Sequence, residues 1–173
     1  MNYAEWETNV PETLKADGLW QVKAYRLGKF SVDLGWFDVT KLMGDRRTLS
    51  LSDQLYAALG SISANLAEGY SYSTGKNRAR MYEYALGSAR ESREWYYDGR
   101  HVLGDAVMNH RLQLLSEIIR LLIVMIPDQR DRDRIHPLHE TGPAYRVESH
   151  LIESGQPLSA EELESLLQNV PLP

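Results

Sequence analysis

The sequence predicts an all-α protein built around four long helices. Apolar residues recur at three- and four-residue spacings between residues 15 and 126, and this part of the chain contains no proline. No segment shows the alternation of apolar and polar residues that is typical of a half-buried strand. The 173 residues fit one domain with tails, and 43% hydrophobic residues are enough for an ordinary core.

The first two helices are expected over about 19–43 and 50–69. Apolar residues of the first recur at helical spacing: Leu27, Phe30, Leu34 and Phe37. Gly44 and Asp45 end that helix, and Ser50 with Asp53 three residues later resembles a capping box that opens the second. Gly69 marks a break or a bend before the third helix.

The third and fourth helices are expected over about 76–103 and 105–126. In the third, apolar and small residues recur at alternating spacings of four and three residues, which is typical of helices that pack nearly side by side. Gly87 and Gly99 each cost about 1 kcal/mol relative to alanine inside a helix. We therefore expect a packing reason for both, and the close approach of another helix is the simplest one. Gly104 and Asp105 turn the chain into the fourth helix, and Pro127 ends it.

The fourth helix carries two adjacent apolar stripes. The first contains Leu112, Leu115, Ile119, Leu122 and Ile126. The second contains Leu114, Ile118, Leu121 and Met125. A helix on the outside of a small bundle needs only one stripe, so we expect the second to form an oligomer interface. The alternative is a helix that is surrounded within one chain.

The two ends of the chain are acidic and the middle is mildly basic. The net charge is −5. We expect an acidic extension over 1–17, the bundle over 18–126, and an acidic tail over 127–173. Ser159 and Glu162 form a good capping box, which predicts a short helix near 160–169.

Several classes of protein and site are excluded by composition. Cysteine is absent, so disulfides, thiolate metal sites and a cysteine nucleophile are excluded. No apolar run is long enough to span a membrane, and the start of the chain lacks the pattern of a signal peptide. We therefore expect a soluble, cytoplasmic protein that has no membrane association.

Two segments place small and polar residues where a helix normally has large apolar ones. The first is Ser-Ile-Ser-Ala-Asn-Leu-Ala-Glu-Gly-Tyr over 61–70, and the second is Ala-Leu-Gly-Ser-Ala-Arg-Glu over 85–91. The first closely resembles the S-I-P-A-N-I-A-E-G-[FY] signature of the 23S rRNA intervening-sequence proteins, a family of four-helix-bundle proteins. The second resembles that family's other signature through Leu86, Gly87, Ser88 and Glu91.

The resemblance covers about residues 20–126 and implies an antiparallel, up-and-down four-helix bundle that assembles into a ring-like homopentamer. Distant relatives of the family include accessory proteins of diversity-generating retroelements, which bind nucleic acid and a reverse transcriptase. The chain departs from the signature at Ser63, where proline is usual, and at Tyr72 and Ser73, where an arginine often occurs. The second departure weakens a phosphate-binding role for that turn.

The polar residues of these segments suggest a network inside the bundle. Asn65 and Glu68 lie three residues apart on one helix, and Ser88 and Glu91 do so on the next. We expect these four to fix the register of two close-packed helices. The alternative is a Glu68–Glu91 carboxylate pair that acts in acid–base catalysis or holds a metal, but no histidine has the spacing that di-metal bundle sites use.

Basic residues are the candidates for nucleic-acid binding. They lie at the start and end of the first helix and at the start of the third: Lys23, Arg26, Lys29, Arg46, Arg47, Lys76, Arg78 and Arg80. The competing interpretation is a set of solvated side chains or ion pairs. His136, His139 and Glu140 form a weak candidate for zinc, because two further ligands are missing.

The function predicted from the sequence is a non-enzymatic, oligomeric scaffold without catalytic residues, metal or cofactor. One hypothesis gives it RNA, DNA or a nucleoprotein as partner, bound through the basic helix faces. The other is an oligomer that binds only proteins, and a metal-dependent enzyme is an outside alternative.

Overall fold

The computed structural model describes residues 2–135 and 158–173, and all the regular structure in this part of the chain is helical. Four helices are long: α3 (Lys23–Leu42), α4 (Leu49–Ser71), α5 (Gly75–Asp98) and α7 (Asp105–Ile135). The others are short: α1 (Tyr3–Asn9), α2 (Glu12–Lys15), η1 (Gly18–Gln21), α6 (Arg100–Leu103) and α8 (Ala160–Gln168).

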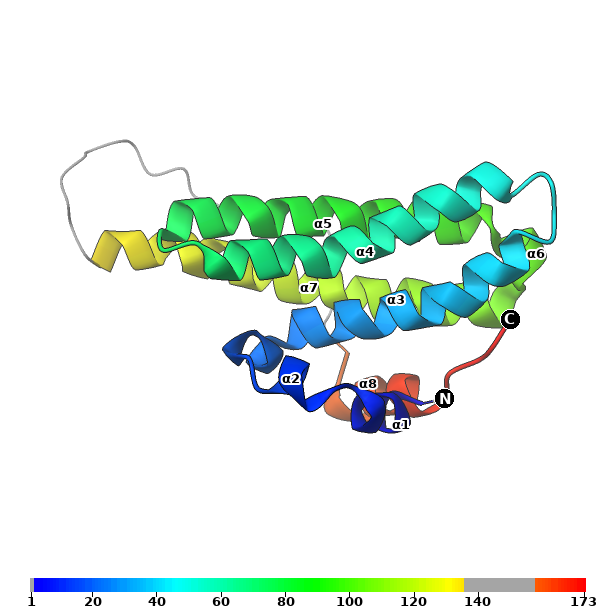
Figure 1. Cartoon of the computed structure of the whole chain (residues 1–173), viewed down its shortest axis with the longest axis horizontal. Coiled ribbons are helices and arrows are strands. Elements are labelled where there is room, and N and C mark those ends of the chain that lie inside the picture. The colour runs from blue at the N-terminus through cyan, green and yellow to red at the C-terminus, as the bar shows by residue number, and fades with distance from the viewer. Residues whose placement is uncertain (1, 136–157) are drawn as a thin grey trace.

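The long helices pack side by side as a bundle (Figure 1). Helix α3 contacts α4, α4 contacts α5, α5 contacts α7, and α7 returns to α3. Their apolar faces meet in one core, which includes Leu34, Leu59, Tyr82 and Leu115. The two terminal helices α1 and α8 contact each other, and Figure 1 places them together beside α3.

Helix α4 begins earlier than the sequence predicts. Its N-cap is Thr48, whose side chain makes no capping hydrogen bond, and Ser50 already lies in the first turn. The Thr48 hydroxyl instead donates to the carbonyl oxygens of Leu42 and Asp45. The predicted capping box of Ser50 and Asp53 is therefore wrong, because the turn after α3 uses Thr48 to satisfy carbonyl groups at the end of α3.

The predicted third helix is divided at Gly99 into α5 and α6. A Cβ atom at Gly99 would lie 3.1 Å from Leu42 Cδ2, so the α5–α6 junction packs tightly against the end of α3. This confirms the packing reason that was expected for Gly99. Gly87 differs, because no heavy atom lies within 4 Å of a Cβ atom built there. The residues that the structure describes thus give no packing reason for Gly87.

Helix α7 continues through Pro127 to Ile135, so the prediction that proline ends it is wrong. Proline inside a helix loses one hydrogen bond and costs about 3 kcal/mol. Contacts beyond it hold the helix in place. Gln129 is 7% exposed and accepts a hydrogen bond from Arg78 Nη1 at 3.1 Å, and Arg130 forms an ion pair with Glu83. Both partners lie on α5, which therefore supports α7 past the proline.

Both ends of the chain belong to the packed structure. In the N-terminal extension, Trp6 of α1 is 4% exposed and packs against Trp20 and Phe30. The predicted C-terminal helix is confirmed as α8, and its capping box of Ser159 and Glu162 is present. Its apolar face is buried through Leu163 and Leu166. None of the helices in the described residues has the length and apolar character needed to cross a membrane.

Candidate functional site

A buried polar cluster joins three long helices. Asp38 of α3 is 0% exposed, and Tyr96 of α5 and Arg111 of α7 are each 1% exposed. Arg111 binds the Asp38 carboxylate through two parallel hydrogen bonds, from Nε to Oδ2 at 2.8 Å and from Nη2 to Oδ1 at 3.1 Å. The Tyr96 hydroxyl donates to Asp38 Oδ2 at 2.8 Å. The negative charge is therefore held by three donors without water.

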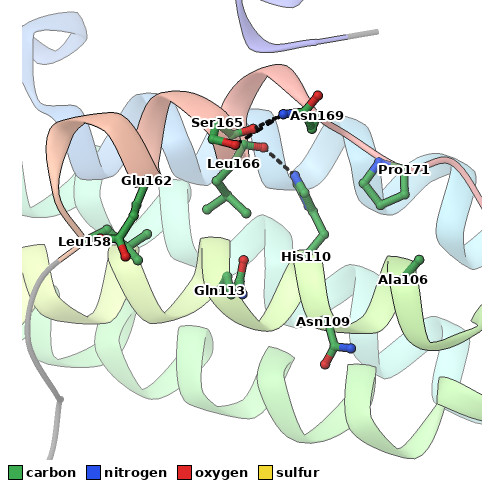
Figure 2. A pocket seen from close by; sticks show the side chains of 10 residues that line it. All are labelled: Ala106, Asn109, His110, Gln113, Leu158, Glu162, Ser165, Leu166, Asn169 and Pro171. Atoms are coloured by element: carbon green, nitrogen blue, oxygen red, sulfur yellow. Dashed lines mark hydrogen bonds between the residues drawn. The ribbon is translucent and has the colours of Figure 1, made fainter.

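The other hydrogen bonds of Arg111 connect it to the C-terminal segment, one directly and one through His110. Its Nη2 also donates to the carbonyl oxygen of Pro171 at 3.0 Å, and its Nη1 lies 2.9 Å from His110 Nδ1. Arginine has no acceptor, so His110 Nδ1 must be the acceptor and Nε2 must carry the proton. The Nε2–H group accordingly donates to the Leu166 carbonyl at 2.8 Å, as Figure 2 shows. His110 is thus neutral and links α7 to α8.

The electrostatics follow from burial. Burial, followed by the positive charge of Arg111, lowers the pKa of His110 to about 4. Burial and the neighbouring Asp38 carboxylate raise the pKa of Tyr96 well above its usual value. Both groups therefore remain neutral at pH 7. Asp38 and Arg111 form the only ion pair among the described residues in which both side chains are fully enclosed.

A cavity of about 560 Å³ lies next to this cluster, between α7 and α8. Side chains from both helices line it, among them Asn109, His110, Gln113, Glu162 and Ser165 (Figure 2). Its polar groups are amides, a hydroxyl and one carboxylate, while the ring nitrogens of His110 are already hydrogen-bonded. The part of the chain that the structure describes holds no group of three His, Asp or Glu side chains suited to a metal ion. The cluster fastens helices together and has no free nucleophile or base.

The sequence carries a signal for this cluster that the prediction missed. Asp38 lies between Leu34 and Leu42 at four-residue spacing, and all three are 0% exposed. Arg111 lies between Val107 and Leu115 in the same way on α7. A carboxylate thus lies within the apolar stripe of one helix, and a guanidinium lies within the apolar stripe of another. This pattern indicates a buried ion pair.

The predicted polar network is wrong. Glu68 and Glu91 are exposed, and Asn65 and Ser88 are only partly buried. Their hydrogen bonds stay local: Glu68 accepts from Tyr72, Glu91 accepts from Trp95, and Ser88 donates to the Tyr84 carbonyl. Since these four residues lie toward the outside of α4 and α5, the register of the helices is set elsewhere. Their exposure also removes the basis for a Glu68–Glu91 site.

The predicted oligomer interface needs a correction as well. Leu114 and Ile118 are both 0% exposed, because α5 and α3 cover α7 within the chain. These two residues belong to the core, as the alternative interpretation of the double stripe expected. Leu121 and Met125 are partly buried, and Val124 between them is 58% exposed.

The eight basic candidates do not form one surface. Arg46 and Arg47 lie in the turn between α3 and α4, and Arg47 pairs with Asp45. Lys23 Nζ lies 3.7 Å from Glu117 Oε1. Lys29 lines a small cavity together with Asp33. Arg26 is partly buried. The other three open α5: Lys76 and Arg80 are exposed, whereas Arg78 is partly buried. The weak zinc candidate at His136 and His139 lies outside the described residues.

Comparison with known families identifies the chain. The family model of the 23S rRNA-intervening sequence protein matches residues 30–124, which is more than half of the chain. The chain belongs to this family. The match confirms the resemblance read from the two signatures, both of which lie inside it. Comparisons with curated proteins and with solved structures gave no match.

Only part of the buried cluster lies within the residues that the family model matches. Asp38, Tyr96 and Arg111 lie within the region shared with 23S rRNA-intervening sequence proteins. The two carbonyl groups that complete the cluster, those of Leu166 and Pro171, lie outside it. The C-terminal segment therefore lies outside the matched region and is fastened to it through two polar side chains of α7.

Proposed function

We propose that the chain is a non-enzymatic, homo-oligomeric scaffold that binds RNA, DNA or a nucleoprotein partner in the cytoplasm, without a cofactor. In this proposal the long helices form an antiparallel, up-and-down four-helix bundle, and copies assemble into a ring-like homopentamer. The family resemblance supports both features of the architecture.

The observation that carries the nucleic-acid part is the charge at the start of α5. The segment 69–82 contains three basic residues and no acidic one. Two of them, Lys76 and Arg80, are exposed. Repetition around a ring multiplies this charge, and basic groups release counterions when they bind phosphates. The other basic candidates contribute less, because acids lie beside several of them.

Exposed apolar side chains support the oligomer. They gather where α3 ends and α4 begins: Trp36 is 60% exposed, Phe37 44%, Met43 57% and Leu49 44%. Tyr56 of α4 packs against Trp36 with ring centroids 6.1 Å apart. Several large apolar side chains exposed in one part of a molecule are typical of protein interaction sites. The same surface favours the second candidate function, an oligomer that binds only proteins.

Light scattering of the full chain at micromolar concentration tests the assembly, and a monomer there overturns the oligomer. A titration with RNA and DNA at about 50 mM and 200 mM salt separates the two functions, because phosphate contacts give a binding constant that falls steeply with salt. An absence of binding at the lower salt concentration rules out the nucleic-acid function and leaves the protein-binding scaffold.

A further inference from the structure

The turn between α4 and α5 combines exposed tyrosines with basic side chains. We call Tyr72, Lys76, Arg80 and Tyr84 the aromatic–basic turn. Tyr72 is 38% exposed and Tyr84 is 47% exposed, while Lys76 and Arg80 lie at the surface beside them in the sequence. Two large aromatic side chains are thus partly open to solvent beside cations.

Arg80 connects the two tyrosines. Its Nε donates to the Tyr84 hydroxyl at 2.9 Å, and its guanidinium carbon lies 5.7 Å from the centre of the Tyr84 ring. It also interacts electrostatically with Tyr72. Among the described residues, the Glu68 carboxylate accepts a hydrogen bond from the Tyr72 hydroxyl. Glu83, which attracts Arg80, also pairs with Arg130 of α7. The cation of Arg80 therefore lies against the Tyr84 ring at the surface, and Tyr72 is near enough to act on its charge.

Contacts with α5 and α7 fix the backbone of the α4–α5 turn. Arg78 Nη2 donates to the Tyr72 carbonyl at 2.7 Å, and its Nη1 donates to buried Gln129 of α7. At the end of α4, a Cβ atom on Gly69 would lie 2.9 Å from Met81 Cβ, so the two helices approach closely there. A site whose backbone is fixed before binding loses little conformational freedom on binding.

We propose that the aromatic–basic turn binds single-stranded nucleic acid, with bases stacked on Tyr72 and Tyr84 and phosphates beside Lys76 and Arg80. Exposed aromatic rings interleaved with cations are the arrangement that recognises single strands, since unpaired bases offer their faces for stacking. Bases within a duplex are stacked on each other and do not offer their faces to protein side chains. This inference rests on the nucleic-acid part of the proposed function and specifies the form of the ligand and its place on the chain.

The chain offers a matched control at the other end of α5. Arg100 lies over the ring of Tyr97, with its guanidinium carbon 4.1 Å from the ring centre, and Tyr97 is 51% exposed. The residue types are thus the same as in the Arg80–Tyr84 pair, and in both pairs the guanidinium lies near an exposed tyrosine ring. The charge differs, because the segment 91–105 contains four acids against two arginines. A phosphate backbone is repelled there.

The test is a fluorescence anisotropy titration of the full chain at about 50 mM salt, with labelled oligonucleotides of about 12 nucleotides. The probes are single-stranded oligo-dT, single-stranded oligo-U and a DNA duplex of equal length. The variants are Tyr84→Leu, Tyr84→Phe, Arg80→Gln and the control Tyr97→Leu. Thermal unfolding of each variant checks that these surface changes leave the fold intact.

We expect both single strands to bind more tightly than the duplex. Tyr84→Leu should raise the Kd by about 5-fold to 100-fold, the loss expected for one stacked base. Tyr84→Phe keeps the ring and should stay within about 3-fold of the unchanged protein, while Tyr97→Leu should have no effect. A preference for oligo-U or for oligo-dT supports the site in either case and identifies the class of strand.

Other results overturn the inference. Tighter binding of the duplex, or equal losses in Tyr84→Leu and Tyr97→Leu, shows that the aromatic–basic turn does not select single strands. Binding that is insensitive to both Tyr84→Leu and Arg80→Gln places the nucleic acid elsewhere and leaves the proposed function standing. An absence of binding to all three probes removes the proposed function together with the inference.

Discussion

Two regions of this molecule use arginine and tyrosine in opposite ways. In the buried cluster, Arg111 and Tyr96 share one carboxylate, that of Asp38, and all three side chains are enclosed. In the aromatic–basic turn, Arg80 and Tyr84 contact each other at the surface, and nearby Glu83 pairs with Arg130 of α7. The same two residue types therefore complete their interactions in one region and leave them available in the other.

The difference shows how to separate stability from recognition in this fold. Removing a member of the buried cluster leaves a charge without a partner in a medium of low polarity, and that cost is large. Removing a member of the exposed turn leaves water in its place, at little cost to folding. Changes in the first region should therefore alter the free energy of unfolding, and changes in the second should alter binding.

The largest effect is expected from Arg111→Met. The substitution keeps an unbranched apolar stem but leaves Asp38 buried without its two charged hydrogen bonds, so the free energy of unfolding should fall by about 3–5 kcal/mol. Urea denaturation followed by circular dichroism measures this. Arg47→Met is the control, because Arg47 forms a similar ion pair with Asp45 at the exposed α3–α4 turn. We expect no measurable change there.

The double variant Asp38→Leu/Arg111→Met sharpens this result. An apolar pair removes both charges together, so it should recover most of the stability that Arg111→Met loses. If the double variant is as unstable as the single one, the cost comes from the packing of the arginine side chain and the contrast between the two regions fails.

A pH effect of intermediate size is expected at His110. Its pKa is about 4 in the folded chain and 6.5 when unfolded, so the unfolded chain binds more protons between these values. Stability contributed by the neutral ring is fully present above pH 6.5 and is lost as the pH falls toward 4. The loss is at most about 3 kcal/mol, since one pKa unit corresponds to about 1.4 kcal/mol.

Unfolding measured at pH 7.5 and at pH 5 checks this effect. His110→Gln should reduce the difference in stability between the two pH values, whereas His101→Gln should preserve it, because His101 is exposed. Arg111, Asp38 and Glu162 are the charged groups around the ring, and only Arg111 opposes its protonation directly. An unchanged pH dependence in His110→Gln contradicts the assignment of the neutral, α8-bound histidine.

The sequence predicted the helical class, the C-terminal helix and the family, because these depend on local spacing and on short motifs. It did not predict that α7 passes Pro127, since the contacts that outweigh the proline come from Arg78 and Glu83 of α5. Asn65 and Glu91 were placed inside the bundle because small residues surround them, but spacing alone does not tell which side of a helix is covered. Asp38 and Arg111 show the converse, because their position within apolar stripes marks them as buried.

The smallest effect compares two glycines on the adjoining helices α4 and α5. A Cβ atom at Gly69 would lie 2.9 Å from Met81 Cβ and 2.8 Å from Tyr82 Cε1, at the base of the aromatic–basic turn. Since Met81 Cβ is fixed to the backbone, Gly69→Ala should lower the free energy of unfolding by about 1–2 kcal/mol. In Gly87→Ala the added methyl group has no atom of the described residues within 4 Å, so the substitution should raise the free energy of unfolding by up to about 1 kcal/mol through helix propensity.

Thermal or urea unfolding of both variants, combined with light scattering, measures the comparison. Equal effects of the two substitutions contradict the close approach of α4 and α5 at Gly69. A loss of stability in Gly87→Ala that is accompanied by dissociation places another copy of the chain against that open surface, because no described residue lies near the added methyl group. The open side of α5 then belongs to the assembly, whereas Gly69 acts within one chain through its contact with Met81 and Tyr82.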